Sequence, residues 1–132
     1  MALYTSSYAI ACRESKLDIF SRIAPAGEIS HKFLMFSHIV IFWTDPAKIN
    51  APDEVIAGAR KYLAPIPGVV HFHLGKMARS HRDVVDQSYQ VGLSIQFESK
   101  KAQDDYQDHP MHLEFVDRCK ALWTRVVVYD FE

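Results

Sequence analysis

The residues best suited to chemistry in this chain lie in one short element, Tyr106-Gln-Asp-His109-Pro-Met-His112. Tyr106 and His109 are three residues apart, so they share a face if the segment is helical. Pro110 disfavours helical geometry at His109, which ends that helix and lets a second helical stretch begin near His112. A histidine exchanges protons near neutral pH, and a tyrosine hydroxyl can donate to a developing oxyanion. The element is therefore a candidate acid–base pair.

The phase of His112 predicts where its side chain points. The apolar residues that follow it at offsets of three, seven and ten are Phe115, Cys119 and Leu122. These offsets place His112 on the apolar stripe of its helix, so we expect it to point inward. In an earlier apolar strand, His38 shares one face with Val40 and Phe42. If that face lines the interior of a barrel, His38 and His112 converge with Tyr106.

A structural role for the same residues is the alternative. A histidine beside a proline at a helix start often caps the helix or joins a local hydrogen-bond network. Tyr106 can bury its ring and satisfy its hydroxyl on a backbone carbonyl. Catalysis requires an open cavity that reaches both side chains, whereas a structural role allows the space to be filled by aromatic residues.

No metal or cofactor site is predicted. His71 and His73 lie two residues apart on a predicted strand, so they face the same way, as a metal pair would. No nearby cysteine or carboxylate completes a ligand set, and His81 and Asp86 are only loop candidates. Paired histidines on a solvent-facing strand are more often simply polar surface residues.

The composition is typical of a small globular protein of the cytoplasm. The chain has 132 residues, enough for one domain, with 48% apolar and 23% charged residues. Fifteen Lys plus Arg against sixteen Asp plus Glu give a net charge of −1, which favours neither nucleic acid nor a membrane as a partner. Cys12 and Cys119 form neither a CxxC motif nor a disulfide framework. No apolar run is long enough to span a bilayer, and the N-terminus lacks a secretory signal pattern.

The hydrophobic periodicity predicts the order β-α-β-β-α-β, which is typical of a ferredoxin-like α+β domain. The predicted strands are 38–44, 69–74, 88–98 and 125–131. The first helix is expected to open near Pro52, and the second to begin at a Ser99 N-cap and to break at Pro110. Residues 1–34 have no sustained period and form a predicted N-terminal extension whose order the sequence leaves open, outside a domain of residues 35–132. A start of translation at Met35 is the alternative.

The strands look apolar on both faces, although the helices of such a unit cover only one. A second copy of the chain, packed face to face with the first, would cover the other. We therefore predict a homodimeric α+β barrel that closes around a shared interior.

The chain resembles the stress-response A/B barrel family, within the dimeric α+β barrel superfamily. The resemblance covers about residues 35–132 in family order, and the Y-x-x-H-P-x-H element is its most specific part. The other matching segments are His38-Ile-Val-Ile-Phe42, Ile66-Pro-Gly-Val69 with Gly75, Gln96-Phe-Glu-Ser99 and Val126-Val-Val-Tyr-Asp-Phe131. The entry to the third strand departs from the family, because Val91 stands near the place where the family often has a histidine.

The resemblance implies a site. The family includes plant polyketide cyclases that use a Tyr/His pair for an aldol-type ring closure without a cofactor. Tyr106 and His112 match that pair, which implies His112 as the base and Tyr106 as the donor to the oxyanion. His38 and Trp123 match other pocket-lining positions, and the further candidate ligand-binding residues are Phe42, Val91, His109 and Phe115.

Two functions remain open at this point. One is a small homodimer that binds an apolar or aromatic small molecule in the barrel, without demonstrated catalysis. The other is a cofactor-independent enzyme in which Tyr106 and His112, with His38 nearby, catalyse proton transfer on a polyketide-like or aromatic substrate.

Overall fold

A computed structural model describes residues 35–132 of the protein, and the predictions made for residues 1–34 lie outside this part of the chain. The described elements follow the predicted order, with the second helical unit divided in two. They are β1 (Phe36–Thr44), α1 (Ala51–Tyr62), β2 (Val69–Lys76), β3 (Val91–Phe97), α2 (Lys100–Asp108), α3 (Pro110–Cys119), the short 3-10 helix η2 (Lys120–Leu122) and β4 (Trp123–Phe131).

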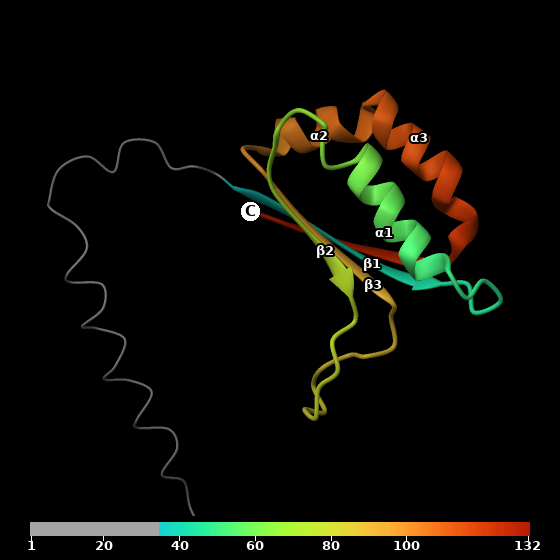
Figure 1. The fold of residues 1–132 in the computed structure, drawn as a ribbon. Coiled ribbons are helices and arrows are strands. Elements are labelled where there is room, and N and C mark those ends of the chain that lie inside the picture. Colours follow the sequence, from blue (N-terminus) through green and yellow to red (C-terminus); the bar gives the residue numbers. More distant parts are fainter. Residues whose placement is uncertain (1–34) are drawn as a thin grey trace, which may run out of the picture. The chain divides into compact units, whose positions relative to one another are not determined.

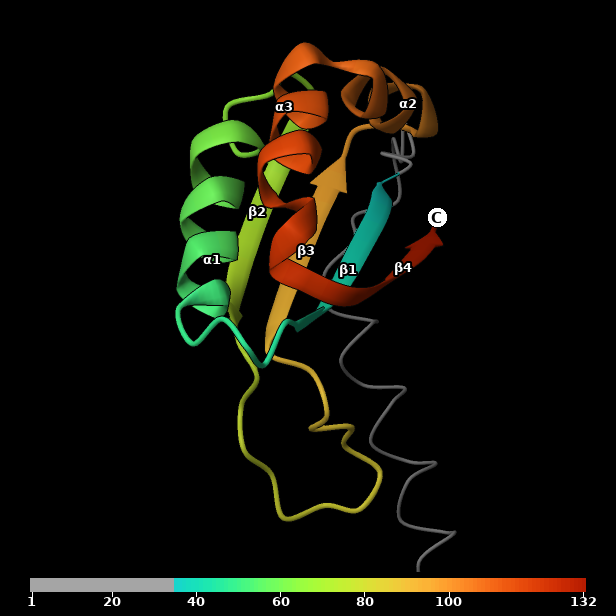
Figure 2. The same cartoon turned by 90° about the vertical axis from the view of Figure 1, so that its right-hand side faces the viewer.

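The strands form one antiparallel sheet in the order β2-β3-β1-β4. This topology is the ferredoxin-like α+β fold that the sequence predicts. Figure 1 shows α1, α2 and α3 together on one side of the sheet. Figure 2 shows α1 and α3 in front of β2 and β3, while most of β4 stands clear of the helices at the edge. The described residues leave the opposite face of the sheet open.

Local signals explain where the helices begin. Pro52 lies in the first turn of α1, where its missing N–H costs nothing, and Asp53 and Glu54 in that turn complement the helix dipole. The predicted N-cap of α2 is confirmed, because the Ser99 hydroxyl accepts a hydrogen bond from the Ala102 backbone N–H at 3.1 Å.

The predicted break at Pro110 is confirmed, and a single residue forms it. His109 has the extended conformation φ −66°, ψ 137°, and it is at once the C-cap of α2 and the N-cap of α3. Its ring nitrogen Nδ1 accepts a hydrogen bond from the Met111 backbone N–H at 3.1 Å. Steric conflict with Pro110 accounts for the extended backbone at His109.

The core lies between the sheet and the helices. Alternate residues of β1 and β3 face the helices and are buried, including Val40 and Phe42 of β1 and Leu93 and Ile95 of β3. The apolar stripe of α1, with Val55 and Ala59, and Phe115 and Cys119 of α3 close this core. Because side chains alternate along a strand, the residues between them point to the open face.

Two details of the strands differ from the prediction. Regular alternation along residues 69–74 would place Val70 on the same face as Phe72 and Leu74, but a register shift between Val69 and His71 interrupts the alternation and leaves Val70 exposed. The third strand begins at Val91 and not at Ser88, because the ladder with β1 starts at the pair Phe42 and Val91. The preceding residues belong to the loop between β2 and β3.

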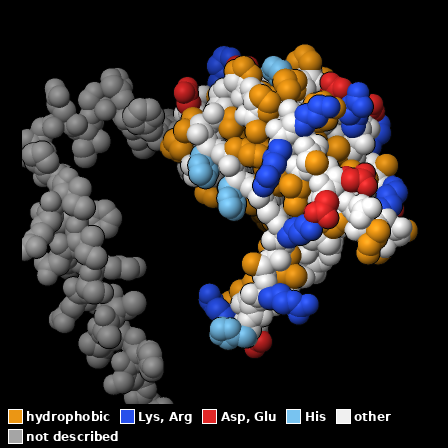
Figure 3. Space-filling model, viewed as in Figure 1, with side chains coloured by type: hydrophobic (Ala, Val, Ile, Leu, Met, Phe, Trp, Pro, Cys, Tyr) orange, Lys and Arg blue, Asp and Glu red, His pale blue; other side chains and the backbone are white. Residues whose placement is uncertain are grey.

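The loop between β2 and β3, residues 77–90, projects beyond the end of the sheet in Figure 1. Figure 3 shows basic, acidic and histidine side chains gathered at its tip. The loop is held by hydrogen bonds between Ser80 and Gln87 in both directions, each 2.9 Å long. Within residues 35–132, none of the helices has the length and hydropathy needed to cross a membrane.

Candidate active and ligand-binding site

A cavity of about 340 Å³ lies between the sheet and the helices of a single chain. It is lined by residues of β1, β3 and β4 on the sheet side, and by residues of α2, α3 and η2, with Leu63 after α1, on the helix side. The predicted convergence was conditional on the His38, Val40 and Phe42 face lining an interior shared by two sheets, and that condition is not met. The helices cover that face, because each of its residues is paired across the sheet with a residue of β3 that is buried under the helices.

The cavity brings together the three residues expected to converge. The ring centroids of Tyr106 and His112 are 4.8 Å apart, and those of Tyr106 and His38 are 6.0 Å apart. Tyr106 comes from the last turn of α2, His112 from the first turn of α3, and His38 from β1. All three line the cavity. Two imidazoles therefore flank one phenol.

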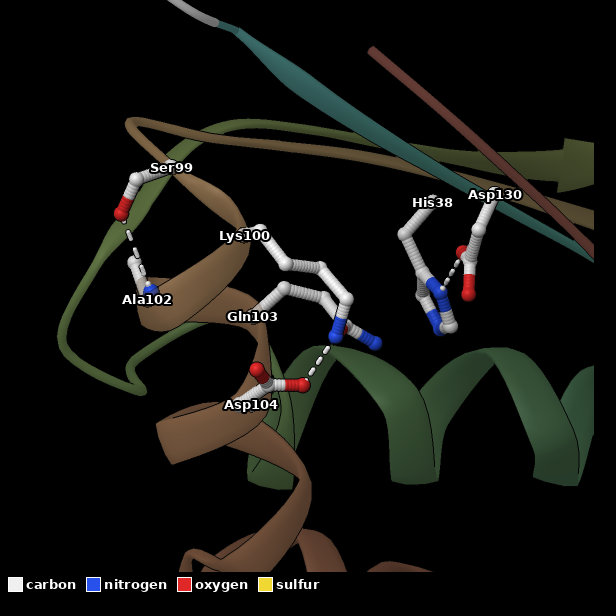
Figure 4. Close-up of polar contacts among 7 residues, drawn as sticks. All are labelled: His38, Ser99, Lys100, Ala102, Gln103, Asp104 and Asp130. Carbon is white, nitrogen blue, oxygen red and sulfur yellow. Dashed lines mark hydrogen bonds and ion pairs between the residues drawn. The ribbon is translucent and has the colours of Figure 1, made fainter.

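An aspartate holds the His38 ring. Nδ1 of His38 lies 2.6 Å from Oδ1 of Asp130, which is the residue paired with His38 across β1 and β4. Figure 4 shows the two side chains together on the face of the sheet that the helices cover. An ionised carboxylate only accepts hydrogen bonds, so Nδ1 of His38 carries the hydrogen and donates it. In the neutral ring, Nε2 of His38 is then free to accept a proton or a hydrogen bond.

Tyr106 is held as a hydrogen-bond donor. Its side chain is 1% exposed, and this burial raises the pKa of the phenol far above its usual range. Removing the charged form from water disfavours ionisation. Tyr106 therefore keeps its proton at neutral pH and can donate it in a hydrogen bond to an oxygen in the cavity.

His112 is a neutral imidazole with an unused nitrogen. Burial lowers the pKa of His112, and the neighbouring His38 makes a smaller contribution in the same direction. The backbone of Gln107 and the carboxylate of Asp108 oppose this shift more weakly. Nδ1 of His112 is buried and forms no hydrogen bond of acceptable geometry with any residue of 35–132. Buried polar atoms are normally paired. Because Nδ1 has almost no accessible surface of its own, a ligand in the cavity would meet the rest of the His112 ring and not this nitrogen.

Aromatic and aliphatic side chains form the rest of the cavity wall. Phe42 and Trp123 lie with ring centroids 5.1 Å apart, and Phe115 and Trp123 with centroids 6.0 Å apart. Toward the edge of the sheet, Val126 and Val128 of β4 line the cavity and remain 42% and 46% exposed. The cavity consequently opens to solvent between α3 and β4.

Two of the predicted ligand-binding residues lie outside the cavity lining. Val91 is fully buried in the core between β1 and the helices, and His109 uses its ring to cap α3. The predicted residues that line the cavity are Tyr106, His112, His38, Phe42, Phe115 and Trp123.

Sequence reasoning missed three polar residues of the site, Asp130, Gln107 and Lys120. Asp130 is 92 positions away from its partner His38, so only the strand register joins them. A signal was present, because Asp130 is in phase with Val126 and Val128 and is the one charged residue in the run 126–131. Gln107 and Lys120 line the cavity and look like ordinary surface residues in the sequence.

No cluster of three or more His, Cys, Asp and Glu side chains in the described part of the chain could hold a metal ion. His71 and His73 lie on the open face of the sheet, opposite Gln96 and Ser94 of β3, where no third metal-binding side chain joins them.

The sequence and the fold both have known relatives. A stress-response A/B barrel domain-containing protein of Arabidopsis thaliana is 29% identical over 97 residues, which cover 73% of this chain and 84% of that protein. A crystal structure of a family protein with a ferredoxin-like fold from Mesorhizobium loti is 30% identical, with a TM-score of 0.60, and the match covers 74% of this chain and 95% of that one.

A structure from Thermobifida fusca, described as a dimeric ferredoxin-like protein of unknown function, matches with a TM-score of 0.62 at 18% identity. That match covers 79% of this chain and 95% of the other, and it concerns the fold alone. Residues 36–132 match the family described as the stress responsive A/B barrel domain. The chain therefore belongs to the stress responsive A/B barrel domain family.

Proposed function

We propose that this protein binds an apolar or aromatic small molecule in the cavity between its sheet and its helices. The observation that carries the proposal is an open space of about 340 Å³ with apolar walls and three convergent polar groups at one end. Small-molecule sites in proteins have this character, with volumes of roughly 300–1,000 Å³. The volume corresponds to the lower end of that range, which suits one small molecule.

The alternative, in which aromatic side chains fill the space, has less support. Phe42, Phe115 and Trp123 pack against one another along the wall and leave the cavity open.

The functional unit that we propose is a homodimer. The open face of the sheet carries a continuous apolar surface from β1 and β4, with Ile39, Ile41, Val127, Tyr129 and Phe131. Tyr129 and Phe131 are each 58% exposed, and a large apolar patch of this kind is typical of an interface. The similar Thermobifida fusca protein is dimeric, which supports a second copy as the partner. The cytoplasmic location remains a prediction from the cysteine content.

The binding proposal can be tested with bicyclic aromatic alcohols such as naphthol, measured by saturation-transfer NMR and isothermal titration. A tryptophan at Val116, which lines the cavity on α3, should narrow the opening and weaken binding by about tenfold or more. Leu113→Trp is the matched control, because Leu113 is exposed on the same helix but does not line the cavity. Equal binding by both variants, or none by the wild type, would reject the cavity as the site.

A second candidate function is cofactor-independent proton transfer, and the Asp130–His38 pair is the observation that favours it. A carboxylate bonded to one ring nitrogen fixes the tautomer and orients the other nitrogen, as in hydrolase triads. In the proposed step, an imidazole of His112 or His38 removes a proton from a carbon next to a carbonyl. The electron pair of the broken C–H bond moves to the carbonyl oxygen, and Tyr106 donates a hydrogen bond to the resulting enolate.

This second candidate predicts exchange of α-protons for deuterium in an aromatic ketone dissolved in heavy water. The rate can be followed by proton NMR for the wild type and for Tyr106→Phe and His112→Gln. If the ketone binds but its α-protons exchange no faster than they do without the protein, the protein only binds the ketone. Exchange that falls by about 10²-fold in both variants would support the acid–base assignment.

A further inference from the structure

We propose that Lys120 binds a carboxylate group of the ligand at the mouth of the cavity, while a second polar group of the same ligand lies beside Tyr106 and His112. This inference rests on the proposed binding function and names the ligand class, an elongated apolar or aromatic carboxylic acid.

The charge of the cavity lining supports an anionic ligand. Among the described residues that line it, Lys120 is the one Lys or Arg and none is Asp or Glu, although the carboxylate of Asp130 lies against the ring of His38. At the inner end, Tyr106 and His112 are held in their neutral forms by burial. Lys120 is 63% exposed, so its attraction for a ligand carboxylate should be that of a partly solvated ion pair. The lining therefore favours a negative charge on the ligand and places it at Lys120.

Lys120 is able to accept a new partner. Its Nζ lies 2.9 Å from Oδ1 of Asp117, and the two side chains are 63% and 77% exposed. An ion pair so exposed contributes little free energy, so Asp117 does not hold Lys120 firmly. The ammonium group has three donors, which lets it bind a ligand carboxylate with or without the bond to Asp117. Asp117 should nevertheless compete with the ligand.

The separation of the two ends sets the shape of the ligand. His112 is in the first turn of α3, and Lys120 follows directly after its last residue, Cys119. Eight residues at a rise of 1.5 Å correspond to about 12 Å along the helix. Between these ends the wall is apolar, with Phe115 and Trp123. A ligand that reaches both ends must therefore be elongated, with an apolar or aromatic body between a carboxylate and a second polar group.

The test compares a hydroxynaphthoate, whose two groups stand at opposite ends of the ring system, with the corresponding primary amide. Affinities are measured by isothermal titration at low ionic strength, where exposed charge interactions are least screened. The wild type should bind the carboxylate about three- to tenfold more tightly than the amide. Lys120→Gln should remove this preference, chiefly by lowering the affinity for the carboxylate. Asp117→Asn should increase the preference, because it removes the competing carboxylate.

Lys101→Gln is the matched control. Lys101 also forms an exposed ion pair, with Asp105 at 2.6 Å, but it lies on α2 and does not line the cavity. Equal affinity of the wild type for acid and amide, or an unchanged preference in Lys120→Gln, overturns the role of Lys120 and leaves the binding function intact. Failure of both probes to bind the wild type overturns the binding function itself.

Discussion

The carboxylate of Asp130 lies beside the ring of His38, with Oδ1 2.6 Å from Nδ1, and the two residues are direct partners across β1 and β4. His38 is nearly buried, whereas the Asp130 side chain is 38% exposed at the edge of the sheet. The pair therefore joins the solvent-facing edge of the sheet to the inner end of the cavity.

Replacement of Asp130 by Asn should change the tautomer of His38. The amide can donate to Nδ1, which would move the ring hydrogen to Nε2 and leave no acceptor toward the cavity. We expect a switch in the nitrogen–proton correlations of His38 in NMR and a loss of about 1 kcal/mol in the free energy of unfolding. An unchanged correlation pattern in Asp130→Asn would show that the carboxylate does not fix the ring.

The lowered pKa of His112 should make stability depend on pH in a defined direction. The unfolded chain binds a proton at His112 near the ordinary value of 6.5, while burial keeps the folded state neutral to lower pH. As pH falls below 6.5 toward the lower pKa of the folded state, the unfolded state holds more protons, so the free energy of unfolding decreases.

His112→Gln should remove that part of the pH dependence. Urea unfolding at about pH 7.5 and about pH 5.5 measures the difference between wild type and variant. His81→Gln, in the exposed loop between β2 and β3, is the control and should retain the wild-type slope. Parallel pH profiles for the wild type and His112→Gln would contradict a buried neutral imidazole.

Tyr106→Phe should leave the fold nearly as stable as before. The ring is buried against Phe97, with centroids 4.9 Å apart, and phenylalanine preserves this packing. We expect the free energy of unfolding to change by less than about 1 kcal/mol, because phenylalanine keeps the buried ring and removes only the hydroxyl. Binding of ligands with an oxygen at the inner end should weaken. A loss of stability above about 2 kcal/mol would instead indicate a structural hydroxyl.

A charge on the open face of the sheet should prevent dimer formation. Ile41 lies opposite Val127 in β4 and Gly92 in β3, so its side chain is at the centre of the apolar surface. In Ile41→Glu, association would bury an unpaired carboxylate, which costs several kcal/mol. Analytical ultracentrifugation should show a folded monomer. Val84→Glu, at a position 81% exposed in the β2–β3 loop, should remain a dimer, and a dimeric Ile41→Glu would place the interface elsewhere.

Gly58→Ala should destabilise the protein despite the higher helix propensity of alanine. A Cβ at Gly58 of α1 would lie 2.7 Å from Sγ of Cys119 in α3, which is too close for either helix to tolerate without a shift. We expect a loss of about 1–2 kcal/mol in urea unfolding. In a Cys119→Ala background the same change should become neutral or stabilising. Additive losses in the double variant would show that the sulfur is not the obstacle.

Local patterns determined most of what the sequence could predict about the fold. The Ser99 cap and the break before Pro110 depend on a few neighbouring residues, and both were confirmed. The inward phase of His112 follows from the apolar stripe of α3, and the structure places this residue in the cavity. These features required no knowledge of the register between strands.

The position of the cavity depended on long-range relationships that periodicity does not contain. Both faces of β1 are apolar, so alternation grouped His38 with Phe42 without showing that the helices cover this face. The pairing of His38 with Asp130 required the register between the first and last strands. The exposed position of Val70 resulted from a register shift in β2, which a period of two cannot anticipate.

The extended residue between α2 and α3 has a geometric consequence for the candidate site. Tyr106 and His112 are six residues apart, and at about 100° per residue an unbroken helix would leave their directions about 120° apart. The two side chains would then not point into the same cavity. The break at His109 resets this angle, and both rings meet at 4.8 Å. The interruption of the helix therefore brings together two side chains that a continuous helix would hold apart.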